Sequence, residues 1–368
     1  MANERIHPAP YLRTTSGDPL GRLVDRLALS PVLCAAIALG AAGLVDVASC
    51  ALVGLEVIER SGWADLWAYV AYLYVVYPVI VGAYVWVGRA ASRLFEGLAV
   101  AQALAATDEA YDRFALGPLQ ARYNHPGWTV ASAILVALVA AYYVFSYTAG
   151  WPWLPRLLRA IKDLVIYVPG WYAICQIVAR EIVTIWGLRQ VFSRFQVTPH
   201  PLHPDRCGGL RAINNYAVGF TYVIAAAGIG VGLIAYSTLH NQGALSASLV
   251  ALIVTYVGIA LVCFFLPPLT AHRAMDEAKR KLLAEISRQF QEDYTQATAR
   301  LDGEAGELQA HVEKVQNLHT LYEMTDAFPV WPFDTATLRR LAVAVLAPLV
   351  PALIELSIVV IGAILNSA

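Results

Sequence analysis

Seven long apolar runs constrain the fold of this chain more than any other feature of its sequence. Each run is long enough to cross a bilayer and carries few charges, and a membrane helix needs about 20 such residues. The runs are continuous rather than alternating with a period of two, so they predict helices and not barrel strands. The predicted spans are 31–58, 66–88, 128–149, 162–188, 213–239, 244–268 and 339–365.

The composition indicates the same class of protein. Hydrophobic residues make up 58% of the chain and charged residues 14%, whereas soluble domains are about 45–50% apolar and about 25% charged. The net charge of -1 provides no basic field for nucleic acid, and the five cysteines show no CxxC spacing. We therefore expect an all-α membrane protein whose partner is the lipid bilayer, with no nucleic acid, no cofactor and no disulfide framework.

Lysine and arginine predict the orientation of the spans. Segment 1–29 has four arginines and segment 269–340 has nine basic residues, whereas loop 239–244 and the C-terminal tail have none. Because basic loops stay in the cytoplasm, this distribution predicts a cytoplasmic N-terminus and an outer C-terminus. Only loop 150–162, with three basic residues, departs from the pattern.

A cytoplasmic insertion is expected between the sixth and seventh spans. Apolar side chains recur every three or four residues from Met275 to Leu301 and again from Leu308 to Tyr322, with "LDGEAG" between them. Two amphipathic helices around a short turn predict an antiparallel hairpin of coiled-coil type. The predicted organisation is a cytoplasmic segment 1–29, transmembrane helices one to six in 30–269, a cytoplasmic hairpin 270–328 and a last transmembrane helix in 329–368.

The loop before the fifth span, "VTPHPLHPDRCGGLRAINNY" (197–216), is unusually rich in polar residues, prolines and glycines. A rigid turn is the first interpretation. The second is a cytoplasmic anion or regulatory site, because helix N-termini present free N–H groups and the loop adds basic side chains. The residues of that candidate site are His203, Asp205, Arg206, Gly208, Gly209 and Arg211.

The same loop contains possible metal ligands. His200, His203 and Cys207 are competent zinc ligands, but their spacing matches no familiar ligand pattern. No metal is therefore predicted, and a site on these residues remains a weaker alternative.

Two acids lie near mid-depth in the predicted spans. Asp46 and Glu355 stand about 21–22 Å along spans one and seven, at about 1.5 Å per residue, and no Lys or Arg lies at mid-depth. Charged groups in a bilayer are costly and are functional candidates by default. We assign Asp46, Glu355 and Ser49, one turn beyond Asp46, to an ion pathway. The alternative is that the acids are protonated and only bond neighbouring helices.

A second charged position is the adjacent pair Arg180 and Glu181 in the fourth span. The length of that span predicts that the pair marks the inner membrane interface, and a functional buried ion pair is the alternative. Small residues at Ala36 and Gly40 and at Gly228 and Gly232 predict close helix approach, within a subunit or between subunits.

The "HPDRCGGL" loop and the "FPVWPF" entry to the last helix (328–333) are similar to those of uncharacterised bacterial multi-pass inner-membrane proteins. The resemblance implies the bacterial inner (cytoplasmic) membrane and implies no activity.

Together these features predict an oligomeric ion channel that favours cations, with inorganic ions as substrates, a homo-oligomeric assembly, and the hairpin serving assembly or gating. The alternatives are a membrane-anchored sensor or scaffold that signals through the hairpin, and an anion channel. An enzyme using the cytoplasmic histidines is the weakest alternative, because the sequence has no recognisable catalytic signature.

Overall fold

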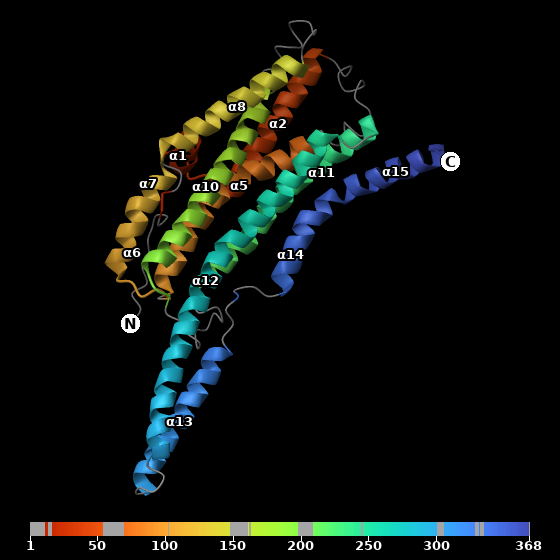
Figure 1. The fold of residues 1–368 in the computed structure, drawn as a ribbon. Helices are drawn as coiled ribbons and strands as arrows, with labels where there is room; N and C mark the ends of the chain where they lie inside the picture. The colour runs from red at the N-terminus through yellow and green to blue at the C-terminus, as the bar shows by residue number, and fades with distance from the viewer. Residues whose placement is uncertain are drawn as a thin grey trace.

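The computed structural model describes residues 12–13, 17–53, 70–101, 103–147, 161, 163–197, 209–243, 246–299, 305–327, 331 and 335–367. Within these residues every regular element is a helix, and the β-type pairing is limited to the isolated bridge Leu104–Val197. The all-α prediction is confirmed. Figure 1 shows an elongated bundle from which one pair of helices projects.

Helices of very different lengths follow one another along the chain. In order they are α1 (Pro19–Arg26), α2 (Pro31–Val53), α5 (Tyr77–Val100), α6 (Asp108–Phe114), α7 (Gln120–Tyr123), α8 (Pro126–Tyr147), α10 (Val168–Arg194), α11 (Arg211–Gln242), α12 (Ala247–Ala299), α13 (Ala305–Asp326), α14 (Thr335–Leu346) and α15 (Val350–Ser367). Shorter helical turns η1 (Tyr72–Val76), η2 (Ala115–Leu119), η3 (Asp163–Tyr167) and η4 (Ala347–Leu349) adjoin them.

Among the described residues, six helical stretches are long and apolar enough to cross a membrane, which suggests a membrane protein. They are Pro31–Ala48, Tyr72–Val100, Asp108–Ala141, Arg211–Asn241, Ala247–Gln296 and Thr337–Ile361. Each overlaps one of the seven predicted spans. The remaining prediction, 162–188, falls on α10, where Gln176, Arg180 and Glu181 interrupt the apolar run.

The core of the bundle is formed by α5, α10 and α11. Helix α10 packs against α5, α8 and α12, and α11 packs against α5, α12, α14 and α15. In the apolar part of α5, 61% of residues are buried, against 17% in α2 and 11% in the stretch that contains α8. The outer helices present large apolar side chains to their surroundings, as lipid-facing helices do; Val32 on α2, for example, is 79% exposed.

The glycines of α11 allow a close helix contact within the chain. A Cβ at Gly232 would lie 2.0 Å from the carbonyl oxygen of Pro348, and one at Gly228 would lie 2.3 Å from the Tyr256 hydroxyl. These glycines therefore serve packing inside one subunit, where the last helical segment bends between α14 and α15. Gly40 on α2 has no neighbouring atom within 4 Å of such a Cβ.

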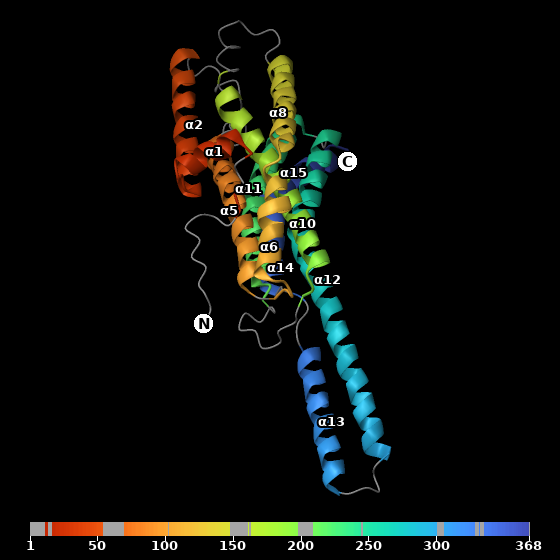
Figure 2. The same ribbon diagram turned by 90° about the vertical axis from the view of Figure 1, so that its left-hand side faces the viewer.

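Helix α12 is much longer than a membrane crossing. Its 53 residues extend about 80 Å at about 1.5 Å per residue, and they continue without a break through the predicted boundary at 269–270. Helix α13 packs beside the second half of α12, as Figures 1 and 2 show. Lys279–Asp326 at 3.4 Å and Lys314–Asp293 at 2.8 Å link the two helices.

The contact between α11 and Pro348 generates a prediction. Gly232→Ala places a methyl group against backbone that has little freedom to move, so we expect a loss of about 1–3 kcal/mol in the free energy of unfolding. Thermal unfolding of the purified protein in detergent measures the effect. Gly40→Ala is the matched control, where the same methyl meets open space and helix propensity favours alanine. A Gly232→Ala protein as stable as the Gly40→Ala protein would contradict this packing.

Candidate functional site: polar groups around α10

The two acids assigned to an ion pathway have hydrogen-bonding partners. Asp46 on α2 is half-buried and accepts a hydrogen bond from the hydroxyl of Tyr74 on η1, with 3.2 Å between the Tyr74 oxygen and Asp46 Oδ2. Ser49 belongs to the same helix. Tyrosine supplies a donor without a charge, so it lowers the cost of the carboxyl group without neutralising it.

Glu355 has a basic partner at the far end of another helix, and that partner is a histidine rather than a lysine or arginine. The Nδ1 atom of His240 on α11 lies 3.1 Å from Glu355 Oε1 on α15. The Glu355 side chain is 15% exposed and that of His240 is 49% exposed. His240 lies near the C-terminal end of α11, close to the turn that leads into α12. The pair is therefore placed near the end of the bundle at which α11 ends and α12 begins.

The fold does not bring the two acids together. Helix α2 packs against α5, η1 and η3, whereas α15 packs against α11 and η4. Figures 1 and 2 show α2 and α15 on separate sides of the bundle. One subunit therefore does not combine Asp46 and Glu355 in a single site.

The described end of the "HPDRCGG" loop is a close-packed turn. Gly209 has φ +90°, and a Cβ there would lie 2.6 Å from the Cβ of Ala103, so only glycine fits without strain. Arg211 begins α11 and is exposed. His203, Asp205, Arg206 and Gly208 lie outside the described residues, so the anion or regulatory site remains a prediction.

The other end of the loop is held by the same segment of chain. Leu104 and Val197 form the isolated bridge, and the Ala105 N–H donates to the carbonyl oxygen of Gln196 at 2.8 Å. Both described ends of the loop thus rest against residues 101 and 103–105. This agrees with the rigid-turn interpretation for the ends.

No group of three His, Cys, Asp or Glu side chains in the described part of the chain is placed to hold a metal ion. The weaker candidates His200, His203 and Cys207 lie outside that part.

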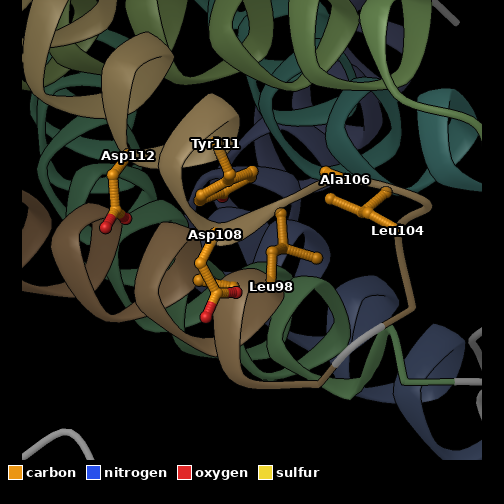
Figure 3. Close-up of a pocket in the computed structure, with 7 residues that line it drawn as sticks. Leu98, Leu104, Ala106, Asp108, Tyr111 and Asp112 are labelled. Carbon is orange, nitrogen blue, oxygen red and sulfur yellow. The ribbon is translucent and has the colours of Figure 1, made fainter.

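A pocket of about 200 Å³ adjoins the segment that holds the loop ends. Its lining residues are Leu98, Ala99, Leu104, Ala106, Asp108, Tyr111 and Asp112. Figure 3 shows Asp108 and Asp112 projecting from one side of α6. Both residues already interact with other groups of the protein, so the pocket by itself does not define a ligand.

The most complete polar cluster surrounds Arg180 in the middle of α10. Its guanidinium Nη2 lies 3.2 Å from Asp18 Oδ2, and the two side chains are 3% and 5% exposed. Arg180 Nη1 donates to the carbonyl oxygen of Tyr84 at 2.7 Å, and the guanidinium lies 4.3 Å from the centre of the Tyr84 ring. A buried arginine with a carboxylate, a carbonyl and an aromatic face is fully compensated.

Asp18 is the centre of this cluster. It accepts hydrogen bonds from the hydroxyls of Tyr84 and Tyr172, the latter at 2.7 Å, and it caps α1 by accepting from the Leu20 N–H at 3.1 Å. The residues beside it are also held, since Gly17 N–H donates to Asn124 Oδ1 at 3.2 Å. One carboxyl group therefore links the N-terminal end of α1 to Tyr84 on α5 and to Tyr172 on α10.

Glu181, the next residue on α10, faces a different set of groups. It is 1% exposed, and its Oε2 accepts a hydrogen bond from the hydroxyl of Tyr216 on α11. One turn further along α10, Thr184 shares a hydrogen bond with the Tyr123 hydroxyl and donates to the carbonyl of Arg180 at 2.9 Å. The hydroxyls of Thr184, Tyr123 and Tyr216 form a second polar layer in the core.

The two neighbouring charges differ in how they are compensated. The burial of an unpaired ion costs several kcal/mol, and a hydrogen bond to a charged group returns about 1.5–3 kcal/mol. Arg180 has a carboxylate and meets this cost, whereas no described Lys, Arg or His forms an ion pair with Glu181. The prediction that the pair only marks an interface is therefore incomplete, because each side chain enters its own buried cluster.

Sequence reasoning missed Asp18, Tyr84, Tyr172, Tyr123 and Tyr216. A partial signal was present, since "SGDPL" (16–20) has an acid before a proline, the arrangement of a helix N-cap followed by N1. The tyrosines gave no signal, because a tyrosine in an apolar helix is as compatible with an interfacial belt as with a buried hydrogen bond.

No family model matches this chain, and no curated protein or solved structure shows significant similarity to it. Function must therefore be inferred from the geometry of the chain itself.

The Asp18–Arg180 pair yields a second prediction. Asp18→Asn leaves the Arg180 charge buried without a counter-ion, so we expect about 3–5 kcal/mol less unfolding free energy. Unfolding in detergent monitored by tryptophan fluorescence measures it. Asp25→Asn makes the same chemical change on an exposed turn of α1 and should have little effect. Equal stability of the two variants would show that Asp18 does not carry the Arg180 charge.

Proposed function

We propose that this protein is an oligomeric membrane ion channel that favours cations, with Asp46, Ser49 and Glu355 near the pathway. The observation that carries the proposal is where the acids lie. Asp46 and Glu355 belong to α2 and α15, two weakly covered apolar helices, and they contact the hydroxyl of Tyr74 and the imidazole of His240. Neither of these two groups carries a permanent positive charge.

The core supports a pathway outside a single subunit. Its basic side chain, Arg180, is compensated by Asp18, and large side chains such as Phe95, Leu188 and Phe264 fill the space around α5, α10 and α12. Large buried side chains thus occupy the described part of the core, as in other close-packed protein interiors. Charged groups that can meet an ion are therefore those on the outer helices.

The surfaces around the acids favour a homo-oligomer. On α2, Leu44 and Val47 beside Asp46 are 73% and 67% exposed, and on α15 the neighbours of Glu355 include the exposed Ile354 and Ile358. A carboxyl group facing lipid is costly, whereas a second copy packed on these faces would enclose it with polar groups or water. We place this assembly in the bacterial inner membrane with the N-terminus in the cytoplasm.

In this proposal the segment 270–328 is a cytoplasmic hairpin that serves assembly or gating. Two ion pairs between α12 and α13 hold the hairpin together. Helix α13 also exposes the apolar side chains of Val312, Leu321 and Met324, at 43%, 46% and 45%. The same exposed apolar side chains favour the second candidate function, a membrane-anchored sensor or scaffold that recruits a partner through this segment. Anion passage near the basic "HPDRCGG" loop is a variant of the first proposal.

Ion flux tests the proposal. We expect purified protein in liposomes to pass monovalent cations, and Asp46→Asn and Glu355→Gln to reduce the preference for cations over anions by about tenfold or more. One unit charge about 4 Å from an ion contributes about 4 kcal/mol at an effective dielectric constant of 20, and about 1.4 kcal/mol corresponds to a factor of ten. Glu313→Gln on the exposed face of α13 is the matched control and should leave selectivity unchanged.

The opposite results have distinct meanings. Folded protein that passes no cation or anion removes the channel proposal and leaves the sensor or scaffold. Flux that is equal in the parent and in both acid variants supports a channel but excludes Asp46 and Glu355 from its pathway.

A further inference from the structure

Glu181 is a buried carboxyl group that the proposed ion pathway does not use. It lies in the core on α10 with 1% of its surface exposed, and the Tyr216 hydroxyl donates to its Oε2. Its other oxygen, Oε1, is buried and has no hydrogen-bond partner among the described residues. A buried polar oxygen without a partner requires an explanation, because native proteins leave few of them.

The neighbouring cation does not compensate Glu181. Arg180 directs its guanidinium to Asp18 and to the Tyr84 carbonyl, and adjacent residues on a helix do not face each other. The other titratable groups around Glu181 are Tyr123 on α7, Tyr216 on α11 and Cys263 on α12. None of these side chains can carry a positive charge. Positive charge for an ionised Glu181 is therefore lacking in the described surroundings.

The space at Oε1 limits which ligand can supply that charge. The atom has less than 1 Å² of accessible surface, so neither a water molecule nor a metal ion of similar size can touch it as the core is packed. A proton bound covalently to the carboxyl group needs no cavity. It also converts an ionised group, whose burial is very costly, into a neutral acid whose remaining cost is one unsatisfied polar atom.

We propose that Glu181 is a proton-binding site in the core, and that the bound proton keeps α10 in its close packing against α5, α8 and α12. The ligand is a single exchangeable proton on Oε1, while Oε2 accepts the hydrogen bond from the Tyr216 hydroxyl. Loss of that proton to solvent leaves a carboxylate that must be hydrated, and hydration requires the packing around α10 to loosen. Alkaline conditions would then open this part of the bundle. The inference is independent of whether the protein conducts ions.

Infrared spectroscopy of the full-length protein in lipid bilayers tests this proposal directly. The probe is the carbonyl stretch of protonated carboxyl groups at about pH 7, where exposed Asp and Glu are ionised. We expect Glu181→Gln to lose one component of this band and Glu313→Gln, on the exposed face of α13, to retain it. Tyr216→Phe should shift the same component without removing it, because it deletes the hydrogen bond and keeps the acid. The Tyr216→Phe result remains informative if Glu181→Gln does not fold.

A second measurement tests the link to packing. The melting temperature of the parent should fall more steeply than that of Glu181→Gln as the pH is raised from about 5 to about 8, because the unfolded parent ionises at this position while the folded parent keeps the proton. Other groups that titrate in this range are common to both proteins. A carbonyl band that is the same in the parent, Glu181→Gln and Tyr216→Phe would show that Glu181 is ionised and would overturn the proposal. Parallel stability curves would remove the link between this proton and the packing.

Discussion

The burial of one positive charge organises the centre of this protein. Arg180 is in the core, and a buried guanidinium is stable only with a counter-ion and further hydrogen-bond acceptors. Asp18 supplies the counter-ion from a segment 162 positions away in sequence, and Tyr84 and Tyr172 complete the cluster. Because Asp18 also caps α1, this one interaction positions α1 against α5 and α10. The apolar packing of the core is built around it.

Helix α10 also shows that a more polar helix of this chain need not be a more exposed one. It is less apolar than the outer helices α2, α8 and α15, yet it lies at the centre of the bundle. The most apolar helices lie outside it and face their surroundings. This inside-out distribution is expected when the solvent is lipid, because apolar side chains gain nothing by leaving a hydrocarbon phase and polar groups must be satisfied within the protein.

The same reasoning separates four acids of the bundle into three kinds. Asp18 is neutralised by a cation, and it is structural. Glu181 is enclosed without one, whereas Asp46 and Glu355 are on outer helices with neutral or titratable partners. Only the last two are placed where another subunit or an ion can reach them, which is why the channel proposal depends on assembly and the proton-binding proposal does not.

The amino-acid sequence determined the helical class, six of the apolar helices, and the presence of charges inside them, because these properties depend on runs of neighbouring residues. The tertiary structure alone decided which of those charges meet. Neither the distance from Asp18 to Arg180 nor the contact between His240 and Glu355 leaves a local pattern. The glycines at 228 and 232 show the same division: their spacing predicts a close contact, but only the bend at Pro348 determines that the contact lies within one chain.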